Sequence, residues 1–298
     1  MTVRTALQQT PQLQIVRSGV RWVREFARRY PLSAFWGGIA VLVILVAILA
    51  PLISPKDPLA TNPLVGLRPP SREYPLGTDF VGRDVLSRII HGARMSLFVA
   101  VVSVLLGTTF GAALALVSGF VGGKLDLFSQ RVVEVLQSFP AVLLALLLST
   151  ALGAGLWTVI FAIAATRIAY GTRIIRAQVL AVKDMPYVDA AISLGASPLR
   201  IMFYHIAPQC IAPFLVLVTT YLGVAIVLEA TLGFLGAGIP PPTPTWGNML
   251  GDASSMLIPR WYLVIFPGIA IVITVLAFNL LGDGLRDAFD PRLRGTTM

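Results

Sequence analysis

Side chains that carry out most enzymatic chemistry are scarce in this sequence. It contains one cysteine, Cys210, and two histidines, His91 and His205, which are far apart. A single cysteine excludes an intramolecular disulfide and any cage of several thiolates. Neither histidine has a neighbour at the spacing of a metal site. We therefore predict no catalytic residue, no metal site and no cofactor in this chain.

The nearest approach to a nucleotide-binding loop is Gly123-Lys124. A phosphate-binding loop needs the pattern G-x-x-x-x-G-K-[ST], in which backbone amides cradle the phosphates. Here Ser118 stands in place of the first glycine and Leu125 in place of the last residue. We expect any ATP and Mg²⁺ to be bound by other chains.

Charged residues also occur within long apolar stretches. Arg131 and Glu134 begin one stretch, Arg167 lies well inside the next, and Glu229 lies near the end of a third. Ionisable groups at membrane depth often mark an ion or solute pathway. Because these charges lie towards the ends of the stretches, we favour ion pairing or pathway lining over a proton relay.

One turn could face such a pathway. Pro140 follows Gln137, Ser138 and Phe139, and proline breaks a helix. We predict a kinked turn here that lines a pathway together with Glu229.

The composition of the chain indicates the surroundings of these charged and polar groups. Hydrophobic residues make up 56% of the 298 residues and charged residues 12%, whereas soluble domains have about 25% charged residues. Lipid must therefore surround much of the chain. The net charge of +9 does not indicate nucleic-acid binding, since the basic residues lie between apolar stretches.

The apolar stretches predict an all-α membrane protein with six transmembrane helices. A cytoplasmic segment, 1–34, precedes a single membrane domain, 35–298, and an amphipathic surface helix is expected over 12–30. Outer loops are expected at 54–95 and 237–260. The expected spans are 35–53, 96–120, 130–152, 156–178, 206–232 and 261–282.

Loop charges predict the orientation. With the N-terminus inside, most Arg and Lys residues fall in cytoplasmic segments, as is usual for membrane proteins. Both termini are therefore expected in the cytoplasm. The first outer loop is also basic, but acidic residues interleave with its basic ones, which indicates an ion-paired, folded loop.

The cytoplasmic loop 179–205 predicts a helix–turn–helix. Asp184 is placed to cap a helix that begins near Pro186, and Gly195 can take the left-handed conformation that ends it. Ser197 would cap a second helix. A plain two-helix connection would have the same signals.

This loop resembles the EAA loop of permeases from binding-protein-dependent ABC importers. The match consists of Asp189-Ala190-Ala191, then Gly195, then Pro208 thirteen residues beyond. It departs from the family pattern in having Asp189 for the usual Glu and Ala207 for the usual Leu. Other stretches are similar to the "C" permease of the dipeptide/oligopeptide/nickel group, namely 76–97, 234–247 and 282–291.

The resemblance implies a function and a set of partners. The chain would form half of a pathway for short peptides, without enzymatic activity, in the inner membrane. Its partners would be a second, homologous permease, two ATPase subunits, an extracytoplasmic solute-binding protein and membrane lipid. Chelated nickel, glutathione and opine-like solutes are alternative cargoes. A proton-coupled secondary carrier and a scaffolding membrane protein are alternative classes.

The resemblance also implies roles for particular residues. The contact with the ATPase would use Tyr187, Asp189, Ala190, Ala191 and Gly195. The solute-binding protein would dock near Asp79, Arg83, Asp84 and Trp246.

Overall fold

The computed structural model describes residues 23–258 and 260–289, and its fold is all-α, as predicted. Residues 23–29 are helical, and the rest of the expected amphipathic helix 12–30 lies outside the described residues, apart from Tyr30. The long helices are α2 (Pro31–Ile53), α3 (Val85–Val121), α6 (Leu156–Lys183), α9 (Ile211–Phe234) and α11 (Trp261–Phe289). The shorter elements are η1 (Pro63–Val65), α4 (Gly123–Ser138), α5 (Ala141–Leu152), α7 (Pro186–Ser193), α8 (Pro198–Arg200), η2 (Ile201–Ile206), η3 (Ala207–Cys210) and α10 (Trp246–Ser254).

Five helical segments in the described part are long and apolar enough to cross a membrane. They are α2, α3, α6, the continuous segment Pro198–Phe234 and α11, and the pair α4 and α5 gives a sixth candidate if it is counted as one span. Helix α2 is the least covered by the rest of the chain. Its exposed side chains, such as Leu42, Leu45 and Ile48, are apolar and suit contact with lipid.

Two helices occupy the region where the sequence predicts one span, 130–152. Helices α4 and α5 are bent by 93° at a short break. Proline has no backbone N–H and pushes the preceding residue out of the helical region. Phe139 accordingly has φ −90° and ψ 134°, directly before Pro140. The kink therefore forms at the predicted turn, but it is sharp enough to end the helix.

Helices α3 and α6 pack closely through glycine. A β-carbon built on Gly107 would lie 2.4 Å from the carbonyl oxygen of Ala164, and one on Gly111 would lie 2.6 Å from that of Ile168. Small residues let two helix backbones approach in this way. The Gly107–Gly111 pair thus joins two helices of the same chain.

Replacing Gly107 by leucine should destabilise the bundle, since the new side chain would meet the backbone of α6. We expect lower yield of monodisperse protein and a lower melting temperature in detergent. Gly38→Ala is the matched control, because nothing lies within 4 Å of a β-carbon on Gly38. That change replaces a helical glycine by a better helix former and should be neutral or stabilising. Equal melting temperatures for both variants would contradict the close contact.

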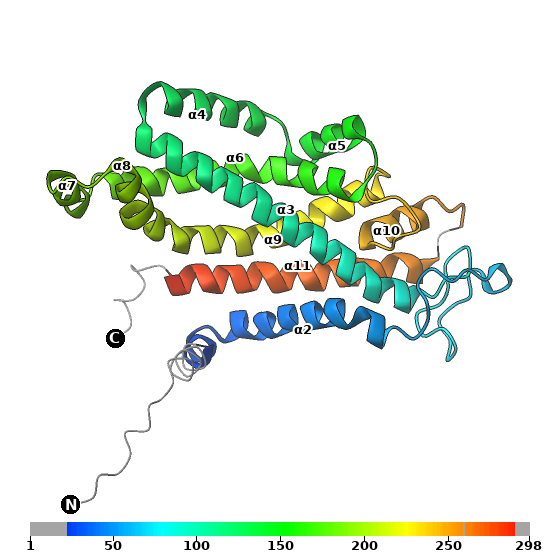
Figure 1. The fold of residues 1–298 in the computed structure, drawn as a ribbon. Helices are drawn as coiled ribbons and strands as arrows, with labels where there is room; N and C mark the ends of the chain where they lie inside the picture. Colours follow the sequence, from blue (N-terminus) through cyan, green and yellow to red (C-terminus); the bar gives the residue numbers. More distant parts are fainter. Residues whose placement is uncertain (1–22, 259, 290–298) are drawn as a thin grey trace, which may run out of the picture.

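The two ends of the bundle differ (Figure 1). Helix α7 lies at one end, and α10 lies at the other beside the long connection between α2 and α3. The helical turn 23–29 and the end of α11 both lie towards the α7 end. We call residues 54–84 together with α10 the outer cap, after the side of the membrane that the sequence predicts for them, and residues 184–206 the α7 hairpin.

Candidate functional site

Helix α7 begins at a proline but lacks the predicted side-chain cap. Pro186 occupies its first turn and Met185 is the N-cap, with extended φ −83° and ψ 143°. Asp184 instead ends α6, with φ −89° and ψ 12°. An N-cap residue needs extended backbone angles, so the predicted capping role of Asp184 is wrong. Asp189 lies in the first turn of α7, where a carboxylate suits the positive end of the helix dipole.

The other end of α7 forms as predicted. Gly195 has φ +79°. Its N–H donates to the carbonyl of Ile192 at 2.9 Å, and the N–H of Ala196 donates to that of Ala191 at 3.0 Å. This pair of bonds is the Schellman motif, which satisfies the last carbonyls of a helix. The hydroxyl of Ser197 then accepts from the N–H of Arg200 and caps α8.

The α7 hairpin buries one face and exposes another. Val188 and Ala191 are buried, and Val188 packs in a cluster with Ile175, Val179 and Ile206. We call seven of its exposed side chains the hairpin surface, namely Asp189, Ala190, Ile192, Leu194, Leu199, Phe203 and Tyr204. The other exposed residues of the hairpin include the polar Asp184, Ser193, Ser197 and Arg200. Most of the hairpin surface is apolar, and Ala190 leaves room for a partner to approach closely.

Tyr187 holds the hairpin together. Its hydroxyl donates to the carbonyl of His205 at 3.2 Å, and its ring stacks on the His205 ring with centroids 6.5 Å apart. Of the five predicted contact residues, Ala191 is buried and the other four, Tyr187, Asp189, Ala190 and Gly195, are exposed. Gly195 also forms the turn that ends α7. The structure therefore brings them into one hairpin but gives them different positions.

Polar contacts fix the base of the hairpin to neighbouring helices. The ammonium group of Lys183, the last residue of α6, donates to the carbonyl of Phe120 near the end of α3 at 2.7 Å. Arg176 on α6 makes two hydrogen bonds to the carboxylate of Asp126 on α4, at 2.6 and 2.5 Å. Bidentate pairs of this kind fix orientation as well as distance. The hairpin therefore starts from an end of α6 that is held by contacts with α3 and α4.

A buried ion cluster holds the outer cap. The carboxylate of Asp79 lies 2.6 Å from Nε of Arg83 and 3.7 Å from Nε of Arg88. Arg83 also reaches the carboxylate of Asp252 on α10, at 3.7 Å. Burial raises the pKa of the Asp252 carboxyl, and the two arginines oppose this rise. The cluster ties the loop before α3 to α10.

Asp84 and Trp246 are also structural. Asp84 caps α3 by accepting from the N–H and the hydroxyl of Ser87 at 2.8 and 2.6 Å. The indole N–H of Trp246 donates to the carbonyl of Ile89 at 3.0 Å. The four residues predicted to dock a binding protein are therefore all buried, with Trp246 only 2% exposed. They shape the cap from within, so their side chains cannot form its outer surface.

The predicted pathway residues fall in two different settings. Gln137 is half-buried, and Ser138 and Phe139 are exposed at the bend between α4 and α5. Glu229 is 1% exposed in the packed interior, with the hydroxyls of Ser96 and Thr245 beside it. Its burial places it away from any open surface of this chain.

The other charged residues of the apolar stretches contact neighbouring side chains. Arg131 pairs with Glu134 at 2.7 Å, as the favoured ion-pair interpretation predicts. Arg167 is buried, and its guanidinium carbon lies 5.4 Å from the ring centroid of Tyr170 and 5.1 Å from that of Tyr221. Such cation–π contacts stabilise an arginine side chain that is buried away from water.

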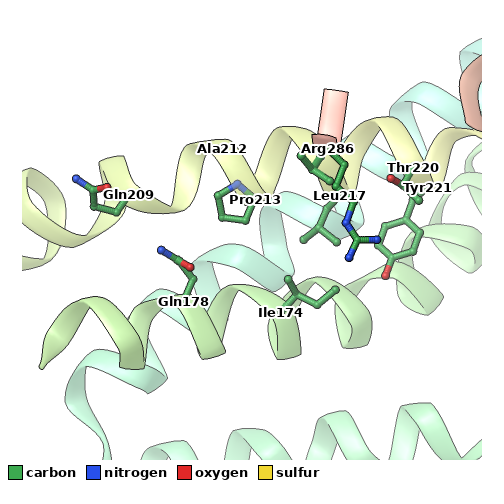
Figure 2. Close-up of a pocket in the computed structure, with 10 residues that line it drawn as sticks. Ile174, Gln178, Gln209, Ala212, Pro213, Leu217, Thr220, Tyr221 and Arg286 are labelled. Carbon is green, nitrogen blue, oxygen red and sulfur yellow. The ribbon is translucent and has the colours of Figure 1, made fainter. Parts of the chain in front are cut away.

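Sequence reasoning missed a groove of about 760 Å³ between α6 and α9. Figure 2 shows Gln178 and Gln209 towards one end and Arg286, from α11, beside Tyr221 at the other. The remaining wall is mostly apolar, with the hydroxyl of Thr220 among it. The sequence does show polar residues inside the apolar spans. Periodicity alone does not show which of these residues line the same groove.

Together, membrane-length helices, a braced hairpin at one end and a folded cap at the other define a multi-spanning membrane protein with two differentiated ends. The family model for the inner membrane component of binding-protein-dependent transport systems matches residues 107–295. The chain belongs to this family, whose members are the permease components of ABC importers and are not enzymes.

Curated relatives agree with the family. The chain is 42% identical over 287 residues to the dipeptide transport system permease protein DppC of Haemophilus influenzae, covering 90% of this chain and 97% of that protein. It is 39% identical to the di/tripeptide transport system permease protein DppC of Pseudomonas aeruginosa, covering 89% and 93%. It is also 39% identical to the glutathione transport system permease protein GsiD of Pectobacterium atrosepticum, covering 91% of each.

The fold has a solved counterpart. A crystal structure of an amino acid ABC transporter with histidines matches 68% of this chain and 94% of its own, with a TM-score of 0.54 and 23% identity. This likeness concerns the arrangement of helices alone.

Proposed function

We propose that this chain forms half of the pathway of an ATP-driven importer of short peptides, and that the hairpin surface receives an ATPase subunit. The observation that carries the proposal is the hairpin surface itself. Leu194 is 88% exposed and Tyr204 78% exposed, and large apolar side chains that gather on one exposed element favour an interaction site. The names of the dipeptide permease relatives support the cargo class.

The arrangement of the two ends supports an orientation. If the hairpin surface meets an ATPase, the α7 end lies in the cytoplasm together with both ends of the described chain. The outer cap then faces the solute-binding protein. The second permease would complete the pathway. Glutathione is a second candidate cargo, since it is itself a tripeptide and a 39% identical relative bears its name.

The mechanism follows from this arrangement. Closure of two ATPase subunits on ATP would move the α7 hairpins, and the braced contacts of Lys183 and Arg176 would carry that movement into α3, α4 and α6. The membrane halves would then open outward to take solute from the binding protein. Hydrolysis would return them to the inward-facing state.

Co-purification with co-expressed partner chains tests the proposal. Wild type should retain an ATPase in detergent, whereas Ala190→Glu should lose it, because the change puts a charge on the small exposed position. Ala190→Ser keeps the size and should retain the ATPase. Leu64→Glu places the same charge on the outer cap, where Leu64 is 91% exposed, and should also retain it.

Two results would contradict the proposal. One is that wild type purifies without any ATPase and moves solute in vesicles without ATP, which would instead indicate a proton-driven carrier. The other is that Ala190→Glu binds ATPase as well as wild type does.

A further inference from the structure

The groove between α6 and α9 has a positively charged residue, Arg286, in its wall. Arg286 lies beside Tyr221 in this wall. The guanidinium carbon of the buried Arg167 lies 5.1 Å from the centroid of the same Tyr221 ring. Within residues 23–258 and 260–289, no carboxylate forms an ion pair with either arginine. Low-dielectric walls strengthen the attraction of such a site for an anion.

The groove does not suit contact with lipid tails. Gln178, Gln209, Thr220 and Arg286 contribute polar atoms to its wall, and such groups are costly when they face hydrocarbon. By contrast, the exposed surface of α2 is apolar. The groove therefore faces water or another protein chain, as a wall of a solute pathway does.

We propose that Arg286 binds the carboxylate of the transported solute and that the groove is the wall where this contact forms. The inference rests on the proposed function and deepens it by specifying a carboxylate-bearing cargo. A guanidinium matches a carboxylate with two parallel hydrogen bonds. The amides of Gln178 and Gln209 supply donors and acceptors of the kind that peptide groups need.

Binding of trialanine and its C-terminal amide to the whole importer complex in detergent, without binding protein, tests this contact. Saturation-transfer NMR should show a stronger signal for trialanine than for the amide with wild type. Arg286→Gln should remove the preference, at about a tenfold loss of affinity for the acid. Arg286→Lys should keep part of it, because the charge remains. A purely structural role for Arg286 would not change the ratio of acid to amide.

Two further variants make the result specific. Arg173→Gln removes an exposed arginine of α6 that does not line the groove, and it should leave the preference intact. Ala212→Asp puts a carboxylate on the groove wall, and it should lower trialanine binding even if Arg286→Gln fails to fold.

Uptake of trialanine by the reconstituted complex separates this inference from the proposed function. Arg173→Gln should leave uptake close to wild type, whereas Arg286→Gln should lower it. Normal uptake and an unchanged acid preference in that variant would overturn the inference and leave the importer proposal standing. Displacement of trialanine by phosphatidylglycerol alone, with uptake unaffected by Arg286→Gln, would assign the groove to lipid. Absence of ATP-dependent uptake in wild type would contradict the proposed function instead.

Discussion

Gly195→Pro should abolish solute uptake while the protein still inserts into the membrane. The φ of +79° at Gly195 is outside the range that proline can adopt. Proline would also remove the N–H that donates to the carbonyl of Ile192. The turn after α7 could not form, so the hairpin surface would lose its shape. The spans lie outside this turn, so membrane insertion should be normal.

Uptake and solute-stimulated ATP hydrolysis in proteoliposomes are the measurements for Gly195→Pro. We expect uptake near background and hydrolysis that no longer responds to loaded binding protein. Gly195→Asn is the matched control, because asparagine tolerates the left-handed conformation far better than other residues with a side chain. No atom lies within 4 Å of a β-carbon at this position, so the cost of the control is limited to the backbone strain of a side chain at φ +79°. Wild-type uptake by the proline variant would show that the turn is dispensable.

Asp79→Ala should be the most destabilising single change in the outer cap. It leaves the buried Arg83 with the longer contact to Asp252 at 3.7 Å, and the buried Arg88 with a hydrogen bond of 3.5 Å to the carbonyl of Pro58 but no ion pair among the described residues. It also removes the acceptor for the N–H groups of Val81 and Arg83. Removing one partner of a buried pair costs about 3–5 kcal/mol. The melting temperature in detergent should fall by roughly 10 °C.

Glu73→Gln is the comparison for that experiment. Glu73 contacts Lys56 and Arg68 at 3.9 Å each, and its side chain is 64% exposed. Exposed pairs of this kind contribute little, so its melting temperature should match wild type. Similar losses for the two variants would mean that burial of the Asp79 cluster does not determine the stability of the cap.

Local signals in the sequence predict local structure well. Pro186, Gly195 and Ser197 act within a few residues of their own positions, and each has its predicted role in the α7 hairpin. Asp184 fails because α6 continues up to it. Two helix-favouring segments compete for that residue, and packing of α6 against α3 decides the boundary.

Burial of charged residues is harder to predict, because their partners are distant in sequence. In the sequence, Asp79 and Arg83 are typical of an exposed loop. Only the folded structure places Asp252 of α10 beside Arg83. The buried Trp246 donates a hydrogen bond to the carbonyl of Ile89, which is more than 150 residues away along the chain. The groove of Arg286 depends in the same way on three helices. Sequence patterns identify such residues, and only tertiary structure shows whether they face a partner or the interior.

The length of α3 has a mechanical consequence. Its 37 residues contain no proline, and at 1.5 Å per residue they form a rod of about 55 Å, longer than the roughly 30 Å of hydrocarbon in a bilayer. One end is fixed in the outer cap through Arg88, and the other receives Lys183 at the base of the hairpin. A tilt of about 5° about one end would displace the other by roughly 5 Å over that length. A lever of this kind transmits motion across the membrane without any relay of side chains.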